Sequence, residues 1–83
     1  MPVMYVLVST KPGRDEDVLI DILKVNHVRE ANMVYGVSNI IAKIEAESMH
    51  DIRRAYEWEF SKIDGIVHKQ GLVSMDGLYF SKS

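Results

Sequence analysis

The chain has 83 residues, of which 47% are hydrophobic and 27% are charged, and its formal net charge is −2. This composition is typical of a globular domain and argues against an intrinsically disordered chain. Lys and Arg are scattered and outnumbered by acidic residues, which argues against nucleic-acid binding, and the absence of cysteine excludes disulfides and thiolate zinc sites. A domain this small buries only about 60% of the surface that its unfolded chain exposes, so we expect self-assembly.

The amino-terminal residues predict neither a targeting signal nor a membrane anchor. Met1 to Tyr5 leads directly into a strand, without a basic region followed by an apolar signal core. No apolar run approaches the ~18 residues of a membrane-spanning helix. We therefore expect a cytoplasmic protein that does not bind membranes.

The first predicted elements are a strand and a helix. Residues 3–8 are all apolar, which is typical of a central strand covered on both faces. After a break at Lys11-Pro12-Gly13, the acidic residues Asp15 to Asp17 predict a first helical turn, because carboxylates stabilise the positive end of the helix dipole. The helix is expected to end near Lys24, with its core face formed by Val18, Leu19, Ile22 and Leu23.

The middle of the chain predicts a β-hairpin. Side chains alternate in character with a period of two over residues 31–35, within a strand expected at 28–35, and again over residues 40–46, as in half-buried strands. Between these ranges, Gly36 tolerates a positive φ, and the short side chains of Ser38 and Asn39 bond readily to the backbone. We therefore expect a tight turn at residues 36–39 and look there first for a site.

A second helix and a last strand complete the prediction. Ser48 stands three residues before Asp51, close to the pattern of a helix-capping box. The helical periodicity places Trp58 away from the core, and Asp64-Gly65 ends the helix before a strand over residues 66–75. The apolar stripe of this helix consists of Met49, Ile52, Ala55, Tyr56, Phe60 and Ile63.

The element order β-α-β-β-α-β predicts a ferredoxin-like α+β sandwich, a four-stranded antiparallel sheet with two helices on one face. We expect this domain to span residues 1–75 and residues 76–83 to form a short C-terminal tail. The uncovered sheet face should carry an apolar patch that pairs two chains into a dimer. The side chains expected there are Met4, Val6, Val8, Ile41 and Lys43, with Met33, Tyr35, Val67 or Val73 from the edges.

Three segments together resemble the effector-binding domain of the Lrp/AsnC family of transcription regulators. They are Thr10 to Gly13 ahead of the acidic helix, Val34 to Ser48, and Lys62 to Ile66. The resemblance covers residues 3–75 and implies the same fold, a dimer formed by the sheets, a ring of dimers that is often an octamer, and amino-acid effectors bound between dimers. Family members with a helix-turn-helix bind DNA, and these residues leave no room for one. The resemblance therefore implies a stand-alone module that regulates transcription by co-assembly with a full-length regulator.

The resemblance also implies where a ligand binds. The family's Gly-x-x-Asp turn falls on Gly36-Val37-Ser38-Asn39, and its last strand also lines the ligand crevice. Asn39 stands where the family has Asp, so it offers an acceptor but no charge to an ammonium group, while Lys69 aligns with a family threonine. A plain turn shaped by backbone geometry alone is the alternative. The predicted ligand-binding residues are Tyr35, Gly36, Val37, Ser38, Asn39, Gln70 and Gly71.

No sequence motif indicates an active site, a metal centre or a cofactor. His27, His50 and His68 share no i, i+4 helical face, and neither a nucleophile elbow nor a phosphate loop is present. We therefore predict a binding protein and not an enzyme, without metal or cofactor. Two alternatives stay open, a small dimeric ferredoxin-like enzyme and a ligand-free assembly adaptor. An RNA-recognition module would need more stacking aromatics than Tyr5 and Tyr35.

Overall fold

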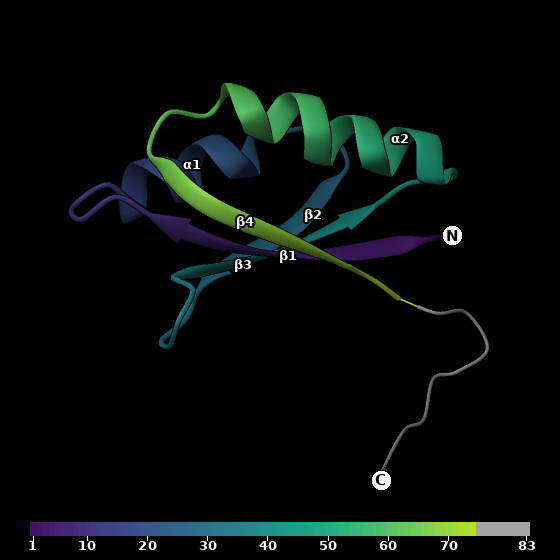
Figure 1. The fold of residues 1–83 in the computed structure, drawn as a ribbon. Helices are drawn as coiled ribbons and strands as arrows, with labels where there is room; N and C mark the ends of the chain where they lie inside the picture. The colour runs from purple at the N-terminus through teal and green to yellow at the C-terminus, as the bar shows by residue number, and fades with distance from the viewer. Residues whose placement is uncertain (75–83) are drawn as a thin grey trace, which may run out of the picture.

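The computed structural model describes residues 1–74 and confirms the predicted ferredoxin-like α+β fold. One four-stranded antiparallel sheet has the order β2-β3-β1-β4, and the helices lie on one of its faces (Figure 1). The central strands are β1 (Val3–Thr10), as predicted, and β3 (Ile40–Glu45). The edge strands are β2 (Val28–Met33) and β4 (Ile66–Val73), and the predicted tail lies outside the described residues, as does Met75.

Both helices begin where the sequence predicts. Helix α1 (Asp15–Leu23) starts with its three acidic residues, and α2 (Met49–Arg54) is capped by the Ser48 hydroxyl, which accepts the Asp51 N–H at 3.2 Å. Beyond α2 the helix continues as a π turn, η1 (Ala55–Glu59), and a 3₁₀ turn, η2 (Phe60–Lys62). Within residues 1–74, no helix has the length and apolar character needed to cross a bilayer.

The core lies between the sheet and the helices. Phe60 and Ile52 from the second helical segment, with Val18 and Ile22 from α1, pack against the central strands and are fully buried. Gly65 lies beside this core, and its φ of +101° is a conformation that glycine adopts without strain. The strand residues of the core are Met4, Val6, Val8, Ile40, Ala42 and Ile44.

The predicted placement of Met4, Val6 and Val8 on the uncovered face is wrong. These side chains are at most 6% exposed and lie under the helices. The strand register explains this, because directly opposite residues share a face and Val6 pairs with the buried Ala42 of β3. Residues 3–8 are apolar at every position, so both alternating sets fit the core equally well.

The uncovered face instead carries the other alternating set of β1. Tyr5 and Leu7 pair with Lys43 and Ile41 of β3, which confirms the predicted placement of these two β3 residues on this face. On the other side of β1, the same two residues pair with Leu72 and Gln70 of β4. Met33 and Val73, which were expected here, pair with core residues Ile40 and Met4 and therefore face the helices.

The predicted four-residue turn of the hairpin is also wrong. Strand β2 ends at Met33, and the connection to β3 runs from Val34 to Asn39. The Val34 N–H donates to the Asn39 carbonyl at 2.7 Å and closes the loop, while the Asn39 N–H donates to Val8 of β1 at 2.8 Å. The loop therefore opens earlier than the alternation suggests and extends beyond the sheet (Figure 1).

Candidate functional site

The loop between β2 and β3 is attached to the end of β1. The Oδ1 atom of Asn39 accepts the Thr10 backbone N–H at 3.1 Å, and the Ser9 hydroxyl donates to the Val37 carbonyl at 3.3 Å. Gly36 has a φ of +139°, which allows the chain to reverse between these attachments. The turn sequence thus has a structural function, because Asn39 bonds to β1 through its N–H and its side chain and to Val34 at the start of the loop through its carbonyl.

The apolar side chains of the loop point into solvent. Tyr35 and Val37 are fully exposed, and Met33 and Val34 at its start are 42% and 37% exposed. Large apolar groups gathered on a loop indicate a surface that contacts a ligand or a partner. Tyr35, Gly36, Val37, Ser38 and Asn39 therefore lie together, as the sequence predicts, on one exposed segment.

A cavity of about 330 Å³ lies beside this loop. Its lining consists of Asp15 from the start of α1 together with Met33, Val34, Tyr35 and Asn39. The volume is at the lower end of the range for small-ligand sites, about 300–1,000 Å³, and suits a molecule the size of an amino acid. Only Tyr35 and Asn39 of the predicted site residues line it.

Asp15 is the functional candidate that sequence reasoning missed. Its position in an acidic first helical turn indicates only a favourable interaction with the helix dipole. In the structure, Arg14 pairs with Asp17 at 3.4 Å and with Asp64 at 3.2 Å, whereas no ion pair of the described residues involves Asp15. The cavity therefore contains one carboxylate that is available to a cation.

Asn39 complements this carboxylate. Its Oδ1 is occupied by the Thr10 N–H, and this bond assigns the amide orientation and leaves the two N–H donors of Nδ2 for other partners. An ammonium acceptor, amide donors and the apolar side chains of Met33 and Val34 thus meet in one cavity. This set matches the groups of an apolar α-amino acid.

Gln70 and Gly71 do not line this cavity. They lie on β4, where they pair with Leu7 and Val6 of β1, and β1 separates them from the β2–β3 loop. Packing explains Gly71, because a Cβ there would lie 2.9 Å from Met4 Sδ and 3.3 Å from the Tyr56 ring. Within one chain, the structure therefore separates the two parts of the predicted site.

Lys69 is occupied by contacts within the fold. Its ammonium group donates to the Tyr56 carbonyl and lies 4.1 Å from the centroid of the Tyr56 ring, and the Tyr56 hydroxyl donates to the Lys69 carbonyl at 3.5 Å. Burial lowers the pKa of Lys69, and the Glu57 carboxylate partly offsets this effect. Lys69 therefore joins β4 to the π turn.

The three histidines do not come together in the structure. Among residues 1–74, no group of three or more His, Asp or Glu side chains is arranged to hold a metal ion. Each histidine belongs to a different segment, with His27 before β2, His50 in α2 and His68 in β4.

The comparisons with known proteins agree with this fold. A family model described as the Lrp/AsnC ligand binding domain matches residues 3–82. The crystal structure of FFRP-DM1 is 24% identical, with a TM-score of 0.84, and the match covers 90% of this chain and 100% of that one. No curated protein sequence matches the chain.

Two longer regulators contain the same fold. Escherichia coli AsnC is 17% identical with a TM-score of 0.82, and the match covers 99% of this chain and 56% of AsnC. The Neisseria meningitidis transcriptional regulator NMB0573, solved as a complex with L-Met, is 14% identical with a TM-score of 0.78, and the match covers 99% of this chain and 55% of that one. This chain thus spans about half the length of these regulators.

Proposed function

Because the chain belongs to the Lrp/AsnC ligand-binding domain family, we propose that it is a regulatory module that binds an amino acid and self-assembles. The family match over residues 3–82 carries this proposal. The complex of NMB0573 with L-Met, a regulator of the same fold, supports an amino acid as the ligand class. A regulatory family also favours a binding role over the alternative of a small dimeric enzyme.

The proposed site is the cavity beside the β2–β3 loop. Asp15 accepts hydrogen bonds from the ligand ammonium, the Nδ2 amide of Asn39 donates to the ligand carboxylate, and Met33 and Val34 contact an apolar side chain. Asp15 thereby supplies the negative charge that Asn39 lacks. Both groups of the Asp15 contact are charged, whereas only the ligand is charged in the Asn39 contact, so the Asp15 contact should dominate affinity.

A calorimetric titration with L-methionine and L-leucine tests this site. Loss of the Asp15 charge in Asp15→Asn should weaken binding about tenfold or more, since a hydrogen bond to a charged group contributes about 1.5–3 kcal/mol. Glu16→Gln is the matched control, because Glu16 is exposed in the same helical turn and does not line the cavity. Equal affinity of Asp15→Asn and the unaltered protein would contradict the assignment, and absence of binding by every common amino acid would favour the ligand-free adaptor.

Self-assembly is proposed through the uncovered sheet face. Tyr5, Leu7, Ile41 and Leu72 form its apolar part, and Lys43 and Gln70 are the polar residues paired with them. Two such faces packed together remove this surface from water, and further contacts join dimers into a ring. We propose that the module acts in the cytoplasm by co-assembly with a full-length regulator and without contacting nucleic acid itself.

A further inference from the structure

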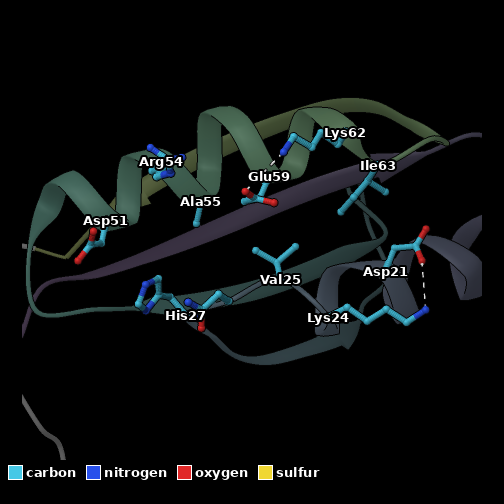
Figure 2. Close-up of a pocket in the computed structure, with 11 residues that line it drawn as sticks. Asp21, Lys24, Val25, His27, Asp51, Arg54, Ala55, Glu59, Lys62 and Ile63 are labelled. Atoms are coloured by element: carbon cyan, nitrogen blue, oxygen red, sulfur yellow. Dashed lines mark hydrogen bonds and ion pairs between the residues drawn. The ribbon is translucent and has the colours of Figure 1, made fainter.

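A second cavity, of about 500 Å³, lies between the helices (Figure 2). One wall is the end of α1 and the connection to β2, within residues 21–27, and the other is the second helical segment, within residues 51–63. It shares no lining residue with the cavity beside the β2–β3 loop. Val25, Ala55 and Ile63 point into the space between the walls and give it an apolar lining (Figure 2).

Charged side chains of both signs surround this apolar lining, but they do not pair across the cavity. Asp21 and Lys24 pair at 4.0 Å on one wall, and Glu59 and Lys62 pair at 3.7 Å on the other, each pair within one helical segment (Figure 2). No ion pair of the described residues crosses between the walls or involves Arg54. Loose and exposed pairs such as Glu59–Lys62 contribute little, so a ligand charge can replace one partner.

The π turn places Arg54 and Glu59 on the same cavity. In a regular α-helix, a residue five positions further on points about 140° away from the first. Here the Phe60 N–H bonds to the Ala55 carbonyl five residues earlier, which widens the turn. Both residues therefore line the cavity, and their Cα atoms lie about one turn apart, on the order of 5–8 Å along the helix.

His27 adds a second nitrogen donor near the Arg54 end. The backbone φ of His27 is +75°, in the left-handed region that residues other than glycine rarely adopt. This conformation is held by two bonds, from the His27 N–H to Asn26 Oδ1 at 3.1 Å and from the Glu45 N–H to the His27 carbonyl at 2.9 Å. The imidazole lies on the wall opposite α2, at the end of the cavity where Asp51 lies (Figure 2).

We propose that this cavity binds a zwitterion whose carboxylate and ammonium groups are separated by about the spacing of the Arg54 and Glu59 Cα atoms along the helix, on the order of 5–8 Å. Arg54 and His27 bind the carboxylate, Glu59 binds the ammonium in place of Lys62, and the body of the ligand lies on Val25, Ala55 and Ile63. The termini of a dipeptide have this spacing, and so do the carboxylate and side-chain ammonium of a basic amino acid. A simple α-amino acid is too short to reach both ends.

Calorimetric titration of the full chain with L-alanyl-L-leucine and, separately, with L-lysine tests the site and distinguishes the two sources. Arg54→Gln and Glu59→Gln should each weaken binding about tenfold, because each removes one charge-assisted contact. Arg53→Gln and Glu57→Gln are the matched controls, since they neutralise neighbouring charges that do not line this cavity, and affinity should change less than about twofold. Binding of either probe with this pattern supports the proposal.

Three results would overturn it. In the first, neither probe binds the unaltered protein at millimolar concentration. In the second, Arg54→Gln and Glu59→Gln bind as tightly as their controls. A lysine signal that is lost in Asp15→Asn but kept in Arg54→Gln would place lysine in the loop cavity and would also count against the proposal. Methyl NMR supplies a direct check, because the ligand should shift Ile63 and leave Ile41 on the opposite sheet face unchanged.

Discussion

At the residue scale, Asn39 has two separate functions. Its backbone and Oδ1 bond to Val8 and Thr10 of β1, while its Nδ2 donors are available to a ligand. An aspartate at this position would also provide the oxygen that the Thr10 N–H needs. Substitutions of Asn39 can therefore distinguish the structural hydrogen bond to Thr10 from the contact between Nδ2 and the ligand.

We predict that Asn39→Asp keeps the stability of the protein but weakens amino-acid binding, because the acceptor remains while the donor to the ligand carboxylate is replaced by a like charge. Asn39→Ala should lose both the affinity and about 1 kcal/mol of unfolding free energy. Urea denaturation and calorimetric titration measure the two effects. Tighter binding by Asn39→Asp would show instead that this position contacts the ammonium group.

The lowered pKa of Lys69 predicts a pH dependence. Burial lowers the pKa of Lys69 in the folded protein below the ordinary value of 10.5, which applies to the unfolded chain. At pH values between these two pKa values, the unfolded chain binds more protons than the folded one. The free energy of unfolding, relative to Lys69→Met, should therefore rise as the pH increases toward 10.5. Denaturant titrations at fixed protein concentration measure this difference, and a difference that is constant or falls with pH would contradict it.

At the element scale, the approach of α1 to the start of β4 depends on Gly65. Its φ is +101°, a Cβ there would lie 2.8 Å from Val18 Cγ2, and its carbonyl accepts the Lys11 N–H at 2.8 Å. This one residue thus joins the end of β1, the core face of α1 and the turn before β4.

We predict that Gly65→Ala costs about 2–4 kcal/mol of unfolding free energy, because backbone strain and overpacking against buried Val18 add together. Gly13→Ala is the matched control. Its φ is also positive, at +81°, but no atom lies within 4 Å of the added Cβ, so only strain of about 1 kcal/mol applies. Equal losses in the two variants would show that packing against Val18 has no effect.

The elements themselves are largely predictable from the sequence, and the exceptions have physical causes. The Ser48 cap and the apolar stripes of both helices identify them because helical spacing is unambiguous there. Which alternating set of β1 side chains faces the helices is not predictable, since every residue from Val3 to Val8 is apolar. The loop length is not predictable either, because the alternation continues through Tyr35, whereas in the structure β2 ends at Met33 and the Val34 N–H bonds to the Asn39 carbonyl across the loop.

The candidate site is less predictable than the fold. The turn motif indicates the loop. Asp15 lines the cavity only because α1 packs beside this loop in the folded chain, and no local sequence pattern predicts that arrangement. Gly71 is expected from the sequence to contact a ligand, but packing explains this glycine, since a Cβ there would lie 2.9 Å from Met4 Sδ and 3.3 Å from the Tyr56 ring. No sequence pattern indicates the π turn that brings Arg54 and Glu59 to one cavity.

At the scale of the whole molecule, the two faces of the sheet predict two different outcomes for charged substitutions. Val6→Glu should prevent folding, because Val6 is fully buried and an unpaired charge in the core costs several kcal/mol. Leu7→Glu should leave the fold intact but dissociate the assembly, since Leu7 lies on the uncovered face. Circular dichroism and the mass of the particle distinguish the outcomes, and an unchanged assembly mass in Leu7→Glu would place the interface elsewhere.

Native mass spectrometry of the purified chain, alone and with a pool of the common amino acids, tests the regulatory-module proposal most directly because it measures assembly and ligand together. We predict an even-numbered assembly, consistent with a ring of dimers, whose mass increases by that of a bound amino acid. A monomer that gains no mass from any amino acid would contradict both parts of the proposal.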